Sequence, residues 1–240
     1  MDKLKHVKGV FLDLGGTLLY PPSGNWNFSA LARQYFPKEL LEAPRAQAVV
    51  EDARRVLEEN HLLSTTREEL ERYLVFYRSI SQGLELNLSP EALYLVAEDK
   101  VFNKKDNYRL FDDTAETLKA LYGKYRLGII SDTWPSIVPL LESFDILKYF
   151  DCVTYSFQLG AFKPDQRLYR DALSKMGLPA GETLFVDDRA CNLEAAREAG
   201  IHPVLIQADS TLPPWEQSIP DGVPVIHRIS GLLDILEEGE

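Results

Sequence analysis

The chain has 240 residues, of which 45% are hydrophobic and 26% charged, and its formal net charge is −11. This length suits one large domain or a domain with an insert. The negative charge disfavours nucleic acid and anionic membranes as partners, because both are negatively charged themselves. The two cysteines, Cys152 and Cys191, lie in no metal-ligand spacing. We therefore expect no disulfide framework and a cytoplasmic setting.

The first predicted strand leads directly into an acidic residue. Residues 10–12 form a short apolar run, and Asp13, two glycines and Thr17 follow. Parallel strands bring such side chains to the carboxyl edge of a sheet, where open α/β folds bind ligands. Asp13 is therefore a candidate for chemistry, although an acid at this place can also simply cap the next turn.

A long segment of helical character follows this strand. It spans roughly 90 residues, which is far too long for a loop in a compact fold. Apolar spacing predicts a helix over residues 49–57. Thr66 and Glu69 have the spacing of a capping box, and Ser89 precedes a proline as an N-cap does. We expect a helical insert above the sheet edge that closes on a substrate, or else a static helical decoration.

Strand-like and helix-like segments alternate through the rest of the chain. This alternation predicts a parallel sheet with right-handed crossovers, and hence an α/β fold. The expected strands cover residues 126–130, 152–155, 184–186, 204–206 and a last short one after residue 223.

Three further segments carry candidate functional groups. One strand ends at Ser131, a glycine loop precedes Lys163, and another strand ends at Asp187 and Asp188. Each has a simpler explanation, because a lysine before a helix is often a surface residue and paired acids often cap a helix. All of them, however, follow strands or loops that point to the same sheet edge as Asp13.

These four segments, in this order, resemble the four motifs of the haloacid dehalogenase-like hydrolase superfamily. The first is Asp13-Leu14-Gly15-Gly16-Thr17, and Ser131, Lys163-Pro164 and Asp187-Asp188 follow. The resemblance covers most of the chain. It implies a Rossmann-like parallel sheet core formed by residues 1–19 and 106–240, with an all-helical cap at residues 20–105. The active site is then shared between core and cap.

The resemblance also implies a nucleophile and a metal site. Asp13 would attack a phosphate ester and form an aspartyl-phosphate, which divides the hydrolysis into two easier displacements. Mg²⁺ would be held by Asp13, the backbone carbonyl of Gly15 and Asp188, with Asp187 as a further ligand or as the residue that orients one. The expected activity is hydrolysis of a phosphate ester bond in a small phosphorylated metabolite.

The remaining implied groups bind the phosphoryl oxygens. Ser131 and Lys163 would hold them, with the lysine as a fixed positive charge that stabilises the transition state. The backbone amides of Asp132 and Thr133 would contribute at the start of the next helix.

Gly15 departs from the pattern of the family's phosphatases, which usually carry a second aspartate there. That aspartate protonates the leaving oxygen, and general acid–base help is worth about 10²–10⁴-fold. Three interpretations remain open. The substrate has a good leaving group, the cap or a water supplies the proton, or the site binds metal and ligand without turnover. The last describes a non-catalytic binding or regulatory protein on the same fold.

Other chemistries of the superfamily fit less well. Dehalogenases lack the paired metal acids that Asp187 and Asp188 represent. Phosphonatases carry a cap lysine in a motif that the surroundings of Lys38 do not match, and phosphomutases require the missing acid. We expect Trp134 to line the pocket and Trp26 to pack. The four histidines, His6, His61, His202 and His227, show no ligand spacing, so we expect structural or solvent-facing roles.

Overall fold

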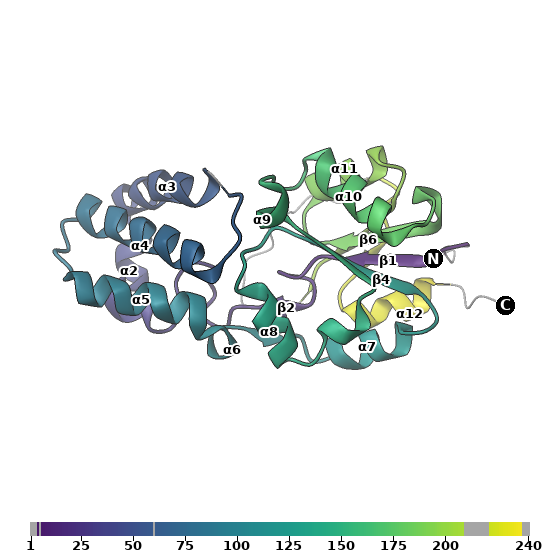
Figure 1. The fold of residues 1–240 in the computed structure, drawn as a ribbon, viewed down its shortest axis with the longest axis horizontal. Coiled ribbons are helices and arrows are strands. Elements are labelled where there is room, and N and C mark those ends of the chain that lie inside the picture. The colour runs from purple at the N-terminus through teal and green to yellow at the C-terminus, as the bar shows by residue number, and fades with distance from the viewer. Residues whose placement is uncertain (1–3, 5, 60, 209–220, 237–240) are drawn as a thin grey trace.

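The computed structural model describes residues 4, 6–59, 61–208 and 221–236. A six-stranded sheet with helices on both faces forms one half of the molecule, and a group of helices forms the other (Figure 1). All neighbouring strand pairs in the sheet are parallel, in the order β5-β4-β1-β6-β7-β8. The strands are β1 (Gly9–Leu12), β4 (Arg126–Ser131), β5 (Cys152–Tyr155), β6 (Thr183–Asp187), β7 (His202–Ile206) and β8 (Val225–Ile226).

Strand β1 lies in the middle of the sheet and pairs with β4 on one side and β6 on the other. The chain builds β4 and β5 on one side of β1 before it crosses to β6. This reversal makes the carboxyl ends of β1, β4 and β6 the crevice in which such sheets bind ligands. The parallel Rossmann-like sheet predicted from the alternation of segments is confirmed.

Alternate side chains of β1 are buried on opposite faces of the sheet. Val10 and Leu12 belong to one apolar cluster and Phe11 to another. The first cluster includes residues of α7 (Thr114–Leu121), α8 (Ile137–Ser143) and α12 (Leu232–Ile235), and the second residues of α10 (Gln166–Met176) and α11 (Ala190–Glu198). Short elements complete this half: α9 (Ser156–Leu159), η1 (Leu147–Tyr149), η2 (Ala180–Glu182) and η3 (Ile229–Gly231).

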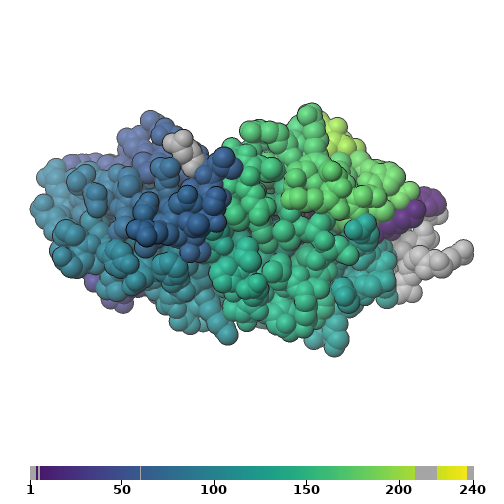
Figure 2. All heavy atoms as spheres, in the orientation of Figure 1, coloured from purple at the N-terminus to yellow at the C-terminus, as the bar shows by residue number. Residues whose placement is uncertain are grey.

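The second half, which we call the cap, contains the helices between β2 and β3. They are α1 (Ala32–Tyr35), α2 (Lys38–Leu41), α3 (Pro44–Glu58), α4 (Thr66–Gly83), α5 (Pro90–Phe102) and α6 (Lys104–Asn107). The cap has its own aromatic-rich apolar cluster, in which Phe28, Tyr73, Phe76 and Tyr77 are buried. It lies against the sheet half, which we call the core (Figure 2). None of the helices in the described ranges is both long and apolar enough to cross a bilayer.

Two short strands join the cap to the core. β2 (Leu19–Tyr20) and β3 (Arg109–Leu110) pair antiparallel, with Leu19 opposite Leu110. The helices therefore enter and leave the core through one two-stranded connection beside the crevice.

The capping box of α4 begins one residue earlier than the sequence spacing indicated. The side chain of Thr65, rather than Thr66, accepts a hydrogen bond from the amide of Glu68, and the Glu68 carboxylate accepts one from the Thr65 amide. Threonine stands at both positions, so the spacing alone allowed either start. As a result Glu69 does not cap the helix, and its side chain is buried.

Candidate active site

The side chains after β1, β4 and β6 meet at one edge of the sheet, and Lys163 joins them. The Nζ atom of Lys163 lies 3.0 Å from Asp13 Oδ1 and 2.6 Å from Asp187 Oδ2. It also donates to the carbonyl of Ile130, at 3.3 Å. Four segments that are distant in the sequence thus meet around one buried lysine.

Lys163 is held in this place by its loop and by its charge. Its backbone amide donates to Asp132 Oδ1 at 2.9 Å, which ties the loop to the end of β4. Burial alone lowers the pKa of Lys163, but the negative charges of Asp13 and Asp187 outweigh it and raise the pKa above the usual range. The lysine is therefore a permanent cation. Burial raises the pKa of Asp132 to about 6, against the lowering effect of Lys163.

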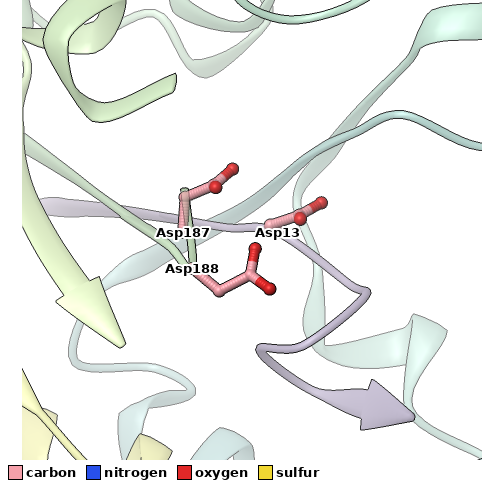
Figure 3. Close-up of side chains that lie close together, drawn as sticks. All are labelled: Asp13, Asp187 and Asp188. Atoms are coloured by element: carbon pink, nitrogen blue, oxygen red, sulfur yellow. The ribbon is translucent and has the colours of Figure 1, made fainter. Parts of the chain in front are cut away.

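Asp13, Asp187 and Asp188 form a cluster of acids. Each offers a carboxylate oxygen, and these three oxygens lie within 4.8 Å of one another. Figure 3 shows the three side chains gathered at the ends of their strands. Hard divalent cations prefer such oxygen ligands.

Asp187 has no free hydrogen-bonding capacity. Its Oδ1 accepts from the amide of Arg189 at 2.8 Å, and the side-chain amide of Asn192 donates to both carboxylate oxygens at 3.0 Å. Lys163 donates to Oδ2. Asn192 is thus a site residue that the sequence reasoning did not single out, although it lies four residues after Asp188.

Asp188 faces the cavity instead, and its surroundings favour a bound cation. Burial, together with the negative charges of Asp187 and Asp13, raises its pKa to about 8. Asp13 Oδ1 is also buried without a hydrogen bond from the described residues, beyond its ion pair with Lys163. Gly16 leaves room for the Asp188 carboxylate, because a Cβ at this position would overlap its Oδ2 atom. These residues fit a divalent metal that neutralises crowded negative charge.

A cavity of about 210 Å³ lies above these groups, between core and cap. The core contributes both the predicted catalytic residues and the end of β4 to its lining, and the cap contributes aromatic and basic side chains. Lining residues from the core include Asp13, Gly15, Ser131, Asp132, Thr133, Trp134, Lys163 and Asp188, and those from the cap are Trp26, Asn27, Tyr73, Lys100, Lys104 and Tyr108.

The backbone after Ser131 differs from the predicted helix start. Helix α8 begins only at Ile137, since the chain runs through a non-helical stretch around Trp134 and Pro135 first. The amide of Thr133 already donates to Ser156 Oγ at 2.8 Å. Ser131 and Asp132 line the cavity at this edge, and the Ser131 hydroxyl and the Asp132 amide can face a phosphoryl group. The ammonium of Lys163 lies beneath them as a fixed positive charge, with its three donors directed at Asp13, Asp187 and the Ile130 carbonyl.

Trp26 fills the space into which a side chain at position 15 would project. A Cβ on Gly15 would lie 3.0 Å from Cη2 and 3.2 Å from Cζ2 of the Trp26 ring. The same ring stacks on Tyr108, with ring centroids 5.9 Å apart. We expected Trp26 to pack in the interior and Trp134 to line the pocket. Each of the two residues packs against the apolar core cluster and also lines the cavity.

His61 connects cap and core. Its ring stacks on Phe162 and meets Trp134 edge-on, with centroid distances of 4.1 and 4.6 Å. Its Nε2 lies 2.8 Å from Ser156 Oγ. Burial lowers the pKa of His61 to about 4, although the backbone of Thr133 and Leu57 raises it. The side chain is a neutral part of the interface, and its expected structural role is confirmed.

The site combines a carboxylate beside a permanent cation, an acid cluster suited to a metal, and a cavity between core and cap above both. Comparison with known proteins identifies the class. A sequence profile of the haloacid dehalogenase-like hydrolase family matches residues 7–200. The chain therefore belongs to the haloacid dehalogenase-like hydrolases.

Relatives within this family include phosphatases. The chain is 29% identical over 210 residues to a phosphoglycolate phosphatase of Salmonella typhimurium. The aligned region covers 83% of this chain and 81% of that protein. It is 30% identical over 241 residues to a glyceraldehyde 3-phosphate phosphatase of Methanothermobacter thermautotrophicus, covering 96% of this chain and all of the other. A 2-haloacid dehalogenase from Pseudomonas syringae shares the fold, with a TM-score of 0.64, 18% identity and coverage of 95% and 97%.

Proposed function

We propose that the protein is a Mg²⁺-dependent phosphatase that hydrolyses a small phosphorylated metabolite through an aspartyl-phosphate at Asp13. The observation that carries this proposal is the position of Lys163 between Asp13 and Asp187, beneath the cavity that Asp188 lines. Relatives named as phosphatases of phosphoglycolate and of glyceraldehyde 3-phosphate support a substrate of this size.

Asp13 is the nucleophile in this mechanism. Attack by its carboxylate on phosphorus breaks the ester bond and forms the acyl phosphate, which water then hydrolyses. Lys163 lowers the repulsion between Asp13 and the anionic substrate, and its charge is already in place before the reaction starts. Ser131 and the Asp132 amide hold phosphoryl oxygens from the other side of the crevice.

The two acids after β6 have different roles. Asp188 and Asp13, with the carbonyl of Gly15, would hold the metal, because these groups line the cavity. Asp187 is buried beneath them and bonded to Lys163, Asn192 and Arg189, so it orients the site. When bound, Mg²⁺ would offset the negative charge that the phosphoryl group brings to this cluster.

The leaving oxygen receives no proton from position 15. Gly15 has no side chain, and Trp26 occupies the adjacent space. We therefore expect a preference for substrates with good leaving groups, which need less protonation. An aryl phosphate should be hydrolysed faster than an alkyl phosphate of similar size.

Hydrolysis of a panel of phosphorylated metabolites, with Mg²⁺ and with a chelator, tests this function. We expect phosphate release that requires Mg²⁺ and is abolished in Asp13→Asn, which keeps the shape of the side chain but removes the nucleophile. Equal negligible release by wild type and variant across the panel would instead favour a non-catalytic binding protein. Equal rates on aryl and alkyl esters would contradict the expected leaving-group preference.

A further inference from the structure

The cap wall of the cavity carries two buried lysines that the proposed mechanism does not use. Lys100, near the end of α5, is 3% exposed, and Lys104, at the start of α6, is 7% exposed. Both side chains line the same cavity as Asp13 and Ser131. Burial of a charged group is costly unless another charge or a ligand compensates it.

The partners of these lysines supply less negative charge than two ammonium groups need. Lys100 donates to the Trp26 carbonyl at 2.6 Å and to the Tyr108 hydroxyl, both neutral groups. Lys104 lies 3.5 Å from Glu69 Oε1. Glu69 itself accepts two further bonds, from the amide and the hydroxyl of Ser136, at 2.8 and 2.5 Å. One shared carboxylate thus faces two cations.

The positive charge of the two lysines lowers the pKa of the tyrosine beside them. Lys100 lies 4.9 Å from the centre of the Tyr108 ring, and Lys104 lies 5.3 Å from it. Burial raises the pKa of Tyr108, but the two ammonium groups outweigh burial and lower it. Burial is the main cause that lowers the pKa of Lys100. An anion in this half of the cavity would be stabilised by both lysines.

The cavity therefore has two ends of opposite character. Asp13 and Asp188 make the core end acidic, and a bound metal, together with Lys163, would prepare this end for a phosphoryl group. Lys100 and Lys104 make the cap end basic. At about 210 Å³ the cavity is smaller than the roughly 300–1,000 Å³ of sites for drug-sized ligands, so it suits a short molecule.

We propose that Lys100 and Lys104 form a subsite for a carboxylate, so that the substrate is a short phosphorylated carboxylic acid. This inference rests on the proposed phosphatase function. The phosphoryl group lies over Asp13, and the carboxylate at the other end of the molecule accepts from the two ammonium groups. The cap thereby recognises the substrate's second charge while the core carries out the hydrolysis.

Paired substrates test this subsite. 2-Phosphoglycolate carries the carboxylate, and 2-hydroxyethyl phosphate has the same length without it. We expect wild type to have the lower KM for the acid. Lys104→Met should raise the KM for the acid by about 10–100-fold, the usual worth of a hydrogen bond between charged groups, and leave the KM for the ester without a carboxylate unchanged. Lys105→Met, one residue away on the exposed side of α6, is the matched control and should change neither.

A second variant acts in the opposite direction. Glu69→Gln can keep both bonds to Ser136 but removes the negative charge beside Lys104, so it should lower the KM for the acid. A purely structural role for the ion pair would instead reduce thermal stability in both variants and affect both substrates equally. That result, or a wild-type enzyme that does not distinguish the two esters, would overturn the subsite.

A binding experiment separates this inference from the proposed function. Calorimetry of 2-phosphoglycolate with Asp13→Asn, alone and combined with Lys104→Met, reports the subsite without turnover. Binding that Lys104→Met weakens supports the subsite even if no substrate is hydrolysed, which would refute only the phosphatase. Hydrolysis of both esters with binding unaffected by Lys104→Met would refute only the subsite.

Discussion

Replacing Gly15 by aspartate introduces the acid that the family's phosphatases usually carry, but the Trp26 ring crowds this position. The new Cβ would lie 3.0 Å from Cη2 of Trp26, so the ring must shift by a few tenths of an ångström to admit it. Overpacking of this kind costs about 1–3 kcal/mol. In a chain of this size each kcal/mol lowers Tm by about 2–4 °C. We therefore expect Gly15→Asp to reduce Tm and to leave the hydrolysis of alkyl phosphates no faster.

Shortening Trp26 should reverse this result. In a Trp26→Ala background the added carboxylate has space, so Gly15→Asp should cost little further stability. It should also restore general acid help, worth about 10²–10⁴-fold on an alkyl phosphate. Gly15→Ala in the same background is the control, because it adds the Cβ without the acid and should not raise the rate.

Thermal unfolding and turnover of ethyl phosphate, measured for all four combinations of the two sites, decide the matter. The double variant should be more stable, and should hydrolyse ethyl phosphate faster, than the sum of the two single effects predicts. The reason is that the added carboxylate fits only when the Trp26 ring is removed. If Gly15→Asp alone accelerates the hydrolysis with no loss of Tm, Trp26 does not block this position and the reasoning fails.

Three further predictions concern the surroundings of the site. Gly16→Ala should weaken Mg²⁺ binding, seen as a higher Mg²⁺ concentration at half-maximal activity, because φ at this residue is 72° and the new Cβ would overlap Asp188; an unchanged Mg²⁺ titration would contradict it. Asn192→Ala should weaken metal binding or activity by about 10–100-fold, since Asp187 loses the donor to both of its oxygens; Asn192→Asp, which also lacks the donor, should not rescue it. His61 should lower the free energy of unfolding as the pH falls from about 6.5 to about 4, because the unfolded chain takes up a proton that the folded protein excludes. Urea denaturation should show a loss of up to about 3 kcal/mol in the wild type and no such loss in His61→Asn. Equal pH dependence in both proteins would refute this prediction.

The core of the fold could be predicted from the sequence because each of its buried strands is an apolar run that can be recognised without knowledge of distant residues. The apolar runs before Asp13, Ser131 and Asp187 each fill a strand that is buried on both faces, and this pattern does not depend on distant residues. Gly177 ends α10 in a left-handed conformation, for which a glycine after an apolar helical repeat is a local signal. Parallel strands have their carboxyl ends at one edge of the sheet. Motifs that follow such strands are therefore expected to meet there, and this expectation needed no knowledge of distant contacts.

The contacts between cap and core could not be predicted in this way. The spacing placed Glu69 in a capping box, whereas the structure places it against Ser136, 67 residues away in the chain. Lys100, Lys104 and the exposed Lys105 occur close together in the sequence, and nothing local distinguishes the two that face the cavity. Likewise, the position of Trp26 over Gly15 depends on how the cap folds back on the core.

The proposed mechanism requires that Asp13 becomes covalently phosphorylated, and mass spectrometry of the acid-quenched enzyme detects this intermediate. Enzyme mixed with substrate and Mg²⁺, quenched during turnover and digested, should yield a peptide containing Asp13 that carries one phosphoryl group. Hydroxylamine should remove this group, as it does from acyl phosphates, and Asp13→Asn should not acquire it. Steady phosphate release with no phosphorylated Asp13 peptide at any quench time, or equal release by Asp13→Asn, would show that Asp13 is not the nucleophile.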